Sequence, residues 1–508
     1  MNFRQGQRID IYDLYKPLRN AIRKLALLPS LTSCWNYQKQ SNVDGAIKIH
    51  RMSDVIYVWE LHALCKEVIL HANGNKDALA TPGGIAHYIN LIRKLKEDIS
   101  ERSIKSTDQA LGEVFQLVHQ QARWQHRRDQ SRIFRAFYIY NDPDLRDLFY
   151  SNLGLTTVDM ATIALTIGGI TKNKIELNKN QDYSMLCVSS KARDRFFEMT
   201  TKTLKDLRSE INIEQRYDQG WAYSWNPLEA YPLINIGNHI NPIIWCPLPE
   251  LLSVRITEGL FYDLLKTEQN FGNQYGKAFE KYVGKVLSDI FHNDKFIISG
   301  EQPYAVKKQQ KHGADWIVSD DTGNLFFECK TRRLAQEAKQ AANGDLLKRY
   351  IENLADAVVQ LYKNFSDVVS GIAGRAHNGL PSYLFIVTYE DWCLTTITVT
   401  DYLINSVKYR LISENMRPEL IEENPFFIVS IEDIEIAGQA IAHLGVRNFC
   451  SHQYIDRYRF FNLKELAMNL FANEQQQYRQ LFQEAWYEMF PALSKLIDKI
   501  PRCGPRPG

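Results

Sequence analysis

The sequence of 508 residues lacks several features that would place it in a protein class at once. Its eight cysteines are scattered and form no CxxC pair, which argues against a zinc module or disulfide framework and favours a reducing, cytoplasmic setting. The N-terminal residues MNFRQGQRIDIYDLYK contain no apolar signal core. The most apolar window, 155–170, is too short to cross a bilayer and contains Asp159, so we expect a buried helix and no membrane association.

An excess of charge of one sign is also missing, because 61 basic and 59 acidic residues leave a formal net charge of +2. This balance predicts neither an acidic partner nor a nucleic-acid binder for the whole chain, so any basic surface must be local. No GxxxxGK[ST] loop occurs, which leaves any ATP-driven step to another protein. Apolar residues nevertheless make up 45% of a chain whose length suggests roughly two to four globular domains.

Residues 1–255 carry mainly helical patterns. Apolar residues recur at helical spacing in 11–28, 54–71, 82–99, 107–139, 155–167 and 191–210. Thr81 before Pro82 predicts a helix start, Pro143 a break, and Gly168 with Gly169 a helix end. From 221 to 265, prolines, aromatics and short β-rich runs predict a connector of strands and turns, with a domain boundary at about 255–270.

Two features of this half are open to a functional interpretation. Arginines between 123 and 135 lie mostly at i, i+4 spacing, which suits either a phosphate-binding face or a solvated face paired with acidic neighbours. We favour the second, because charge runs alone are weak indicators. His239 and Cys246 lack a second ligand pair nearby, so we expect packing or surface roles rather than metal binding.

The stretch 271–333 contains the residues that predict chemistry. A helix is expected to carry Glu280, and two β-prone runs flank the turn-like residues DDTGN at 320–324. The first run carries Asp315 and the second carries Glu328 and Lys330. Because side chains alternate along a strand, Glu328 and Lys330 project from one face, and the correct hairpin register would bring Asp315 within reach. Ionisable groups at the end of an apolar strand are costly to bury unless they are paired or bind metal.

Three carboxylates and one lysine suit Mg²⁺-dependent hydrolysis of a phosphodiester. Asp315 and Glu328 would hold Mg²⁺ (or Mn²⁺), with the backbone carbonyl of Cys329 as a further ligand and Glu280 acting directly or through water. Lys330 would orient or help to deprotonate the attacking water, aided by a pKa that burial lowers. The alternative is an ordinary surface hairpin with a neighbouring ion pair, since ExK alone occurs by chance.

The order of these elements resembles the PD-(D/E)xK nuclease superfamily, which has the restriction-endonuclease-like fold. The family glutamate falls on Glu280 in GKAFEKYV, the metal aspartate on Asp315 in HGADWIV, and the ExK pair on Glu328 and Lys330 in FFECKT. Gly313 and Ala314 replace the name-giving proline. The resemblance implies an α/β core of helix, three strands, helix and strand, a mixed sheet flanked by helices, over 273–291, 295–299, 314–318, 325–330, 334–365 and 383–388.

The resemblance also implies contacts to nucleic acid. Some branches of the family carry a glutamine on the second helix, for which Gln336, Gln340 and Gln360 are candidates and Gln360 is placed best. Basic residues around the site would neutralise the phosphates that flank the scissile bond: Lys307, Lys308, Lys311, His312, Arg332 and Arg333.

We therefore predict three domains: a mainly helical partner, sensor or nucleic-acid-contact domain at 1–255 that ends in the connector, a nuclease domain at 256–445, and a helical extension with a disordered tail at 446–508. Within the last two, 395–399 and 426–431 are strand candidates and 463–500 is a helical region. The expected function is a Mg²⁺-dependent nuclease, with a DNA endonuclease favoured.

The helical N-terminal half is similar in architecture to helical regions that are joined to such nucleases in bacterial anti-phage defence proteins. The similarity implies a protein partner for this half, and a dimer is compatible with the sequence. The alternative function is a catalytically inactive nucleic-acid-binding or assembly module on the same fold.

Overall fold

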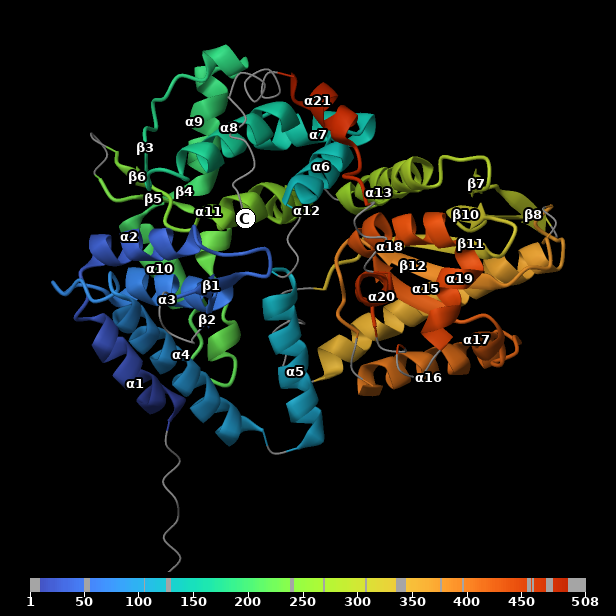
Figure 1. Ribbon diagram of the computed structural model, residues 1–508, viewed down its shortest axis with the longest axis horizontal. Helices are drawn as coiled ribbons and strands as arrows, with labels where there is room; N and C mark the ends of the chain where they lie inside the picture. Colours follow the sequence, from blue (N-terminus) through green and yellow to red (C-terminus); the bar gives the residue numbers. More distant parts are fainter. Residues whose placement is uncertain are drawn as a thin grey trace, which may run out of the picture. The chain divides into compact units, whose positions relative to one another are not determined.

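The computed structural model describes residues 10–49, 55–104, 106–124, 129–237, 242–267, 270–306, 308–334, 344–374, 377–394, 397–454, 458, 461–471 and 478–491. Its chain divides into two compact units, residues 1–269 with 484–508 and residues 270–483 (Figure 1). Each unit contains buried apolar side chains of its own.

The first unit is mainly helical, as the sequence predicts. Its helices are α1 (Ile11–Ile22), α2 (Leu27–Gln38), α3 (Val58–His71), α4 (Pro82–Ser103), α5 (Thr107–Ala122), α6 (Asp129–Tyr140), α7 (Pro143–Leu153), α8 (Thr157–Ile170), α9 (Ser190–Thr200), α10 (Leu204–Glu214), α11 (Pro249–Val254) and α12 (Leu260–Thr267). The Thr81 hydroxyl caps α4 by accepting a bond from the Gly84 N–H at 3.1 Å, which confirms the predicted helix start.

Several predicted boundaries of the first unit are wrong by a turn or more. The 11–28 pattern is two helices, and Pro29 lies inside the first turn of α2 rather than ending α1. The 107–139 pattern is α5 and α6, and the 191–210 pattern is α9 and α10 around the short strand β4 (Thr201–Thr203). Gly168 and Gly169 lie within α8, which ends at Ile170. α8 thus continues through two glycines, although glycine is an intrinsically poor helix former.

Short strands complete this unit. β1 (Ala46–Lys48) pairs with β2 (Val55–Tyr57), and a second sheet has the order β3-β6-β5-β4. Its remaining strands are β3 (Glu176–Leu177), β5 (Leu233–Asn235) and β6 (Ile244–Trp245). The predicted connector therefore supplies two strands of a sheet within the helical unit, and its end is helical through α11, a π-helical turn (Arg255–Gly259) and α12.

The contacts of the arginines at 123–135 support pairing with neighbouring residues rather than a phosphate-binding face. Arg123 bonds to Glu229 through both guanidinium ends at 3.1 and 2.5 Å, and Arg132 donates to the Arg123 carbonyl at 2.8 Å. Arg135 is only 4% exposed. Residues 127 and 128 lie outside the described residues, as does 239, while Cys246 is fully buried.

The most apolar window forms the buried helix that the sequence predicts, because α8 buries Met160, Ile163 and Ile167. In the described part of the chain, no single helix is long and apolar enough to cross a membrane. α7 and α8 reach that length and hydropathy only as a pair bent by 66°.

The second unit is built on a five-stranded mixed sheet of order β13-β12-β11-β10-β7. Its strands are β7 (Ile297–Gly300), β10 (Trp316–Ser319), β11 (Asn324–Lys330), β12 (Ser382–Thr388) and β13 (Phe426–Ser430). β7, β10 and β11 pair antiparallel, whereas β11, β12 and β13 pair parallel. A separate hairpin, β8 (Tyr304–Val306) with β9 (Gln309–Lys311), lies between β7 and β10 in the chain.

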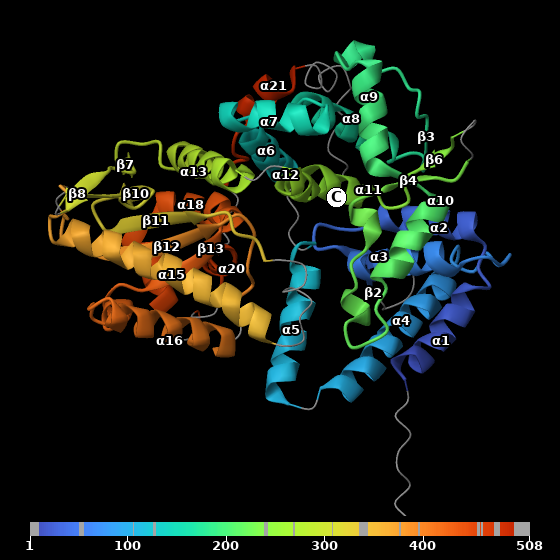
Figure 2. The ribbon, with the colours of Figure 1, turned by 180° about the vertical axis from the view of Figure 1, so that it is seen from behind.

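Helices cover both faces of this sheet, α13 (Phe271–Ile290) on one and α15 (Gly344–Val369) on the other (Figures 1 and 2). Phe326 meets Phe365 of α15 edge to face at 5.2 Å, and the Trp316 indole packs against Gly284 of α13. The remaining helices are α16 (Ile397–Ser413), α17 (Leu420–Glu423), α18 (Ile431–Leu444), α19 (Val446–Cys450) and α20 (Leu463–Leu470). The predicted order of helix, three strands, helix and strand is present, with β8, β9 and β13 in addition.

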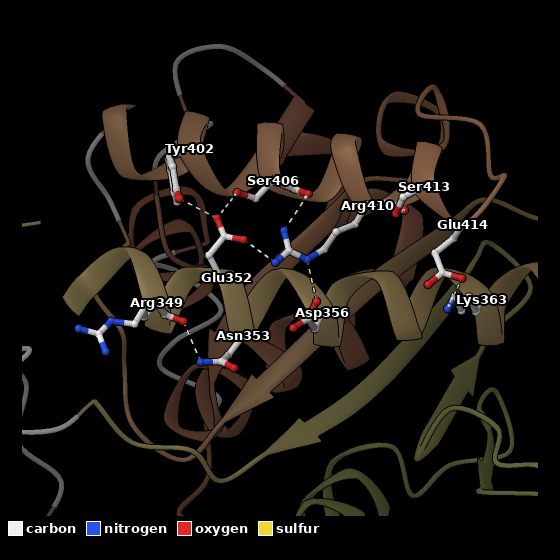
Figure 3. A network of polar contacts seen from close by, with 10 residues as sticks. All are labelled: Arg349, Glu352, Asn353, Asp356, Lys363, Tyr402, Ser406, Arg410, Ser413 and Glu414. Carbon is white, nitrogen blue, oxygen red and sulfur yellow. Dashed lines mark hydrogen bonds and ion pairs between the residues drawn. The ribbon is translucent and has the colours of Figure 1, made fainter. Parts of the chain in front are cut away.

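A polar network fastens α16 to α15 (Figure 3). The Arg410 guanidinium bonds to Asp356 at 2.7 Å and also pairs with Glu352. Glu352 accepts further bonds from the hydroxyls of Tyr402 and Ser406 at 2.6 and 2.8 Å. α15 therefore lies between the sheet and α16 and contacts both.

Two predictions at the C-terminal side need correction. The strand expected at 395–399 is wrong, since residues 397–413 form α16 and 395–396 lie outside the described residues. Its β-branched residues are instead the first turn of a helix that packs on α15. The helical region expected at 463–500 contains α20 and α21 (Gln483–Met489), and residues 492–508 lie outside the described part.

Candidate active site

Strand pairing sets Asp315 opposite Glu328. The outermost pair of β10 with β11 is Trp316 with Phe327, so one further step along the antiparallel register aligns Asp315 with Glu328. At that level the Cys329 N–H donates to Asp315 Oδ2 at 2.6 Å. The site therefore lies just before β10 begins, beside the C-terminal part of β11.

Glu328 and Lys330, which the alternation along β11 predicts to share a face, form an ion pair. Lys330 Nζ lies 2.7 Å from Glu328 Oε1. Glu328 is only 7% exposed, and its other oxygen, Oε2, is buried without a hydrogen-bond partner among the described residues. Burying a carboxylate oxygen that accepts no hydrogen bond costs free energy, so this atom is a candidate for a ligand contact.

α13 brings Glu280 to the same end of the sheet. The Trp316 indole N–H donates to the Glu280 carbonyl at 3.1 Å, so the turn of α13 that carries Glu280 lies over β10. Gly284, one turn later, makes this contact possible, since a Cβ there would lie 2.0 Å from the Trp316 ring. The structure thus brings together all four residues that the sequence singled out: Glu280, Asp315, Glu328 and Lys330.

The carboxylates of the site raise one another's pKa. Burial, and then the neighbouring Glu328 carboxylate, raise the pKa of Asp315 to about 8, although the Cys329 N–H opposes the shift. Burial also raises the pKa of Glu328, against the opposing charge of Lys330. The pKa of Glu280 is raised by burial and by nearby carboxylates. Negative charge is therefore crowded at this point, which favours protons or cations there.

The lowered pKa expected for Lys330 is wrong. Burial is the largest single influence and acts to lower the pKa of Lys330, but the Glu328 carboxylate, its hydrogen bond, Asp315 and Cys329 together outweigh it, so the pKa is raised. Lys330 is therefore an ammonium at neutral pH. Burial likewise raises the pKa of the Cys329 thiol well above its ordinary value, so this thiol is not a nucleophile.

The residues present fit a divalent cation. Among the described residues, no group of three or more His, Cys, Asp or Glu side chains is arranged to hold a metal ion by itself. Mg²⁺, however, commonly takes one or two carboxylates and completes its shell with water and phosphate oxygens. Asp315 and Glu328 offer such a pair, with an unpartnered buried oxygen on Glu328. The Cys329 carbonyl remains a predicted additional ligand.

The basic residues predicted to contact nucleic acid have different surroundings. Lys308 and Arg332 are exposed, whereas Lys311 pairs with Asp367 of α15 at 2.7 Å. His312 Nδ1 lies 3.0 Å from Glu301 Oε1, and 69% of its side chain is exposed. Residue 307 lies outside the described residues. The exposed members remain candidates for phosphate contacts.

Arg333 is not available to a substrate. It is 7% exposed, donates to the Tyr275 hydroxyl at 2.9 Å, and places its guanidinium 4.2 Å from the centre of the Tyr389 ring. These contacts are internal, so the predicted nucleic-acid role of Arg333 is replaced by a packing role between β11 and α13.

The glutamine of the second helix is only partly located. Gln360 is exposed on α15 and donates to Asn364 Oδ1 at 3.1 Å. Asn364 in turn donates to the Gly313 carbonyl at 3.0 Å, two residues before Asp315. Residues 336 and 340 lie outside the described part of the chain.

One carboxylate of this region was missed by reasoning from sequence. Glu301 follows β7 directly and is close enough to raise the pKa of both Glu280 and Glu328. The signal that could have found it is a glutamate just past the first predicted strand.

Comparisons with protein-family models, curated proteins and solved structures found no match to this chain, so its family resemblance rests on the sequence motif alone.

Proposed function

We propose that the chain is a Mg²⁺-dependent nuclease that hydrolyses phosphodiester bonds, with DNA as the favoured substrate. The supporting observation is the buried Glu328, which bonds Lys330 through one oxygen and has no partner for the other, next to the charge-crowded Asp315. Most buried carboxylate oxygens accept at least one hydrogen bond, so an unmet one beside further carboxylates is a candidate for a cation contact.

Each residue then has a chemical role. Asp315 and Glu328 would hold the ion, with Glu280 as a further contact. When bound, Mg²⁺ would supply Lewis-acid stabilisation of the negative charge on the phosphate. The Lys330 ammonium, fixed by Glu328 at 2.7 Å, would donate hydrogen bonds to the attacking water or to a phosphate oxygen.

Exposed basic residues supply the contacts that a polyanion needs. Lys308 and Arg332 lie in the segments that lead into β10 and out of β11, and Lys348 and Arg349 are exposed at the start of α15. Such residues can neutralise backbone phosphates on either side of the scissile bond without reading sequence. In this proposal the helical first unit recognises the partner or signal that directs the nuclease.

The test uses the purified full chain with plasmid DNA, linear DNA and RNA, in Mg²⁺ or in chelator. We expect cleavage only with Mg²⁺, and loss of cleavage in Lys330→Ala with retained folding by circular dichroism. Lys408→Ala, on α16, is the matched control, because its partner Glu422 is 70% exposed and lies outside the site. Equal cleavage by Lys330→Ala, or cleavage in chelator, would contradict the proposal. DNA binding without any cleavage would favour the inactive-module alternative.

A further inference from the structure

The β8–β9 hairpin leaves the main sheet at the level of the candidate active site. It is a separate two-stranded ribbon between the end of β7 and the start of β10. Because Gly300 pairs with Trp316, the next step of the register places Glu301 beside Asp315, where the hairpin leaves and rejoins the sheet. Gln310 of β9 precedes Asp315 by five residues, a length of chain that spans at most about 18 Å.

Polar contacts fix the base of this hairpin. Asp367 Oδ2, in the last turn of α15, accepts hydrogen bonds from the Tyr304 hydroxyl at 2.5 Å and from Lys311 Nζ at 2.7 Å. His312 lies 3.0 Å from Glu301, where the two ends of the hairpin meet. Figures 1 and 2 show β8 beside this end of α15. Since both strands bond to one carboxylate of α15, the hairpin is held in a set direction relative to the sheet.

One face of the hairpin is turned away from α15. Tyr304 pairs with Lys311, and both side chains reach Asp367, so their face lies against the helix. Ala305 pairs with Gln310 on the opposite face, because successive residues of a strand project to opposite sides. Both are exposed, and the Gln310 amide has no hydrogen-bond partner among the described residues. The small Ala305 leaves room for a planar group to approach this amide.

The tip of the hairpin carries positive charge. Val306 pairs with Gln309 across the turn that contains Lys308. Lys308 is exposed and has a φ of +70°, a left-handed conformation that glycine or asparagine adopts more readily. Backbone strain of this kind concentrates at functional sites, so the Lys308 side chain is a candidate for contact with a backbone phosphate.

We propose that the β8–β9 hairpin enters the major groove of duplex DNA, where Gln310 contacts a base edge. The inference rests on the proposed function, in which Asp315 lies at the phosphodiester that is cut. The major groove admits a two-stranded ribbon, and a glutamine amide makes paired hydrogen bonds with N6 and N7 of adenine. At about 3.4 Å per base pair, a reach of about 18 Å places this adenine within about five base pairs of the cut. The major groove of duplex RNA is too narrow for side chains, so the proposal specifies DNA.

The experiment measures binding of the full chain to duplex DNA with a randomised centre, at low salt and in chelator so that no cleavage occurs. Sequencing of the bound fraction should show adenine enriched at one position. Replacing that adenine should weaken binding by the unmodified chain about 5- to 150-fold and binding by Gln310→Ala little. 7-Deazaadenine, which lacks the N7 acceptor, should likewise weaken binding only when Gln310 is present. Gln480→Ala, an exposed glutamine of the same unit, is the matched control and should keep the preference.

The outcomes separate this inference from the proposed function. No base preference in the unmodified chain, or a preference that Gln310→Ala retains, overturns the groove contact and leaves the proposed nuclease standing. Binding to duplex RNA as tight as to duplex DNA overturns the groove contact as well. An adenine preference that depends on Gln310, in a chain that shows no Mg²⁺-dependent cleavage, supports the groove contact and overturns the proposed nuclease.

Discussion

Replacing Asp315 by Asn is expected to stabilise the protein when no metal is present. Asn keeps the size of the side chain and an acceptor for the Cys329 N–H, which bonds Asp315 Oδ2 at 2.6 Å, but it removes the buried charge. Burial and Glu328 raise the pKa of Asp315 to about 8 in the folded state, from an ordinary 3.8. The folded state therefore binds more protons than the unfolded state between these values, so stability falls as pH rises from about 4 to about 8.

The size of the effect follows from the separation of the two pKa values. At about 1.4 kcal/mol per pKa unit, a separation of about four units gives an upper bound of about 6 kcal/mol above pH 8. Relaxation and water entry reduce such penalties, so we expect Asp315→Asn to gain on the order of 2–4 kcal/mol at pH 8.5. Near pH 4, where Asp315 is protonated in the folded state and partly so in the unfolded chain, the gain should fall below about 1 kcal/mol.

The assay is urea unfolding in chelator at pH 4.5 and 8.5, followed by tryptophan fluorescence. Asp321→Asn is the control, because Asp321 is exposed in the turn of the same hairpin and should show no pH-dependent gain. A less stable Asp315→Asn at pH 8.5, or an equal gain at both pH values, would refute the reasoning. Mg²⁺ should offset most of this difference, since a hundredfold excess over Kd adds about 2.7 kcal/mol to the unmodified chain and little to Asp315→Asn.

Two further predictions concern the frame of the site. Gly284→Ala should destabilise the second unit by about 1–3 kcal/mol in urea unfolding, since its Cβ would lie 2.0 Å from the Trp316 ring, while Gly272→Ala on the same helix has open space and should be neutral or stabilising. Arg410→Ala should lower the free energy of unfolding by about 1–2 kcal/mol, because it breaks the network of Figure 3. Lys408→Ala should change the free energy of unfolding by no more than about 0.5 kcal/mol. If Gly272→Ala destabilised the protein more than Gly284→Ala, the packing assignment would be contradicted. If Lys408→Ala destabilised it more than Arg410→Ala, the network assignment would be contradicted.

The hairpin of the site could be predicted because its information is local. Alternation along β11 is enough to place Glu328 and Lys330 on one face, and the turn composition at 320–324 fixes the register that aligns Asp315. The helix before it is marked by apolar periodicity, so Glu280 could be assigned as well. None of these steps needed knowledge of a distant contact.

Glu301 could not be found in the same way, because its neighbour in space is not its neighbour in the chain. The β8–β9 hairpin separates β7 from β10, so no turn composition sets the register between them. Arg333 was misassigned for a related reason, since Tyr275 and Tyr389, which enclose it, come from two other elements. The run at 395–399 has the β-branched residues of a strand, but packing on α15 selects a helix.

Lys330 shows how two local effects must be weighed against each other. Burial alone predicts a lowered pKa and a role in deprotonating water, but the Glu328 carboxylate at 2.7 Å, together with Asp315 and Cys329, outweighs burial and raises the pKa. An ammonium held in this way can donate hydrogen bonds to water or phosphate, yet it cannot accept a proton. Lys330 could act as a base only if its ion pair with Glu328 broke, for example if the Glu328 carboxylate bound a cation instead. In the arrangement that the structure describes, Lys330 is therefore a donor that orients the reacting groups.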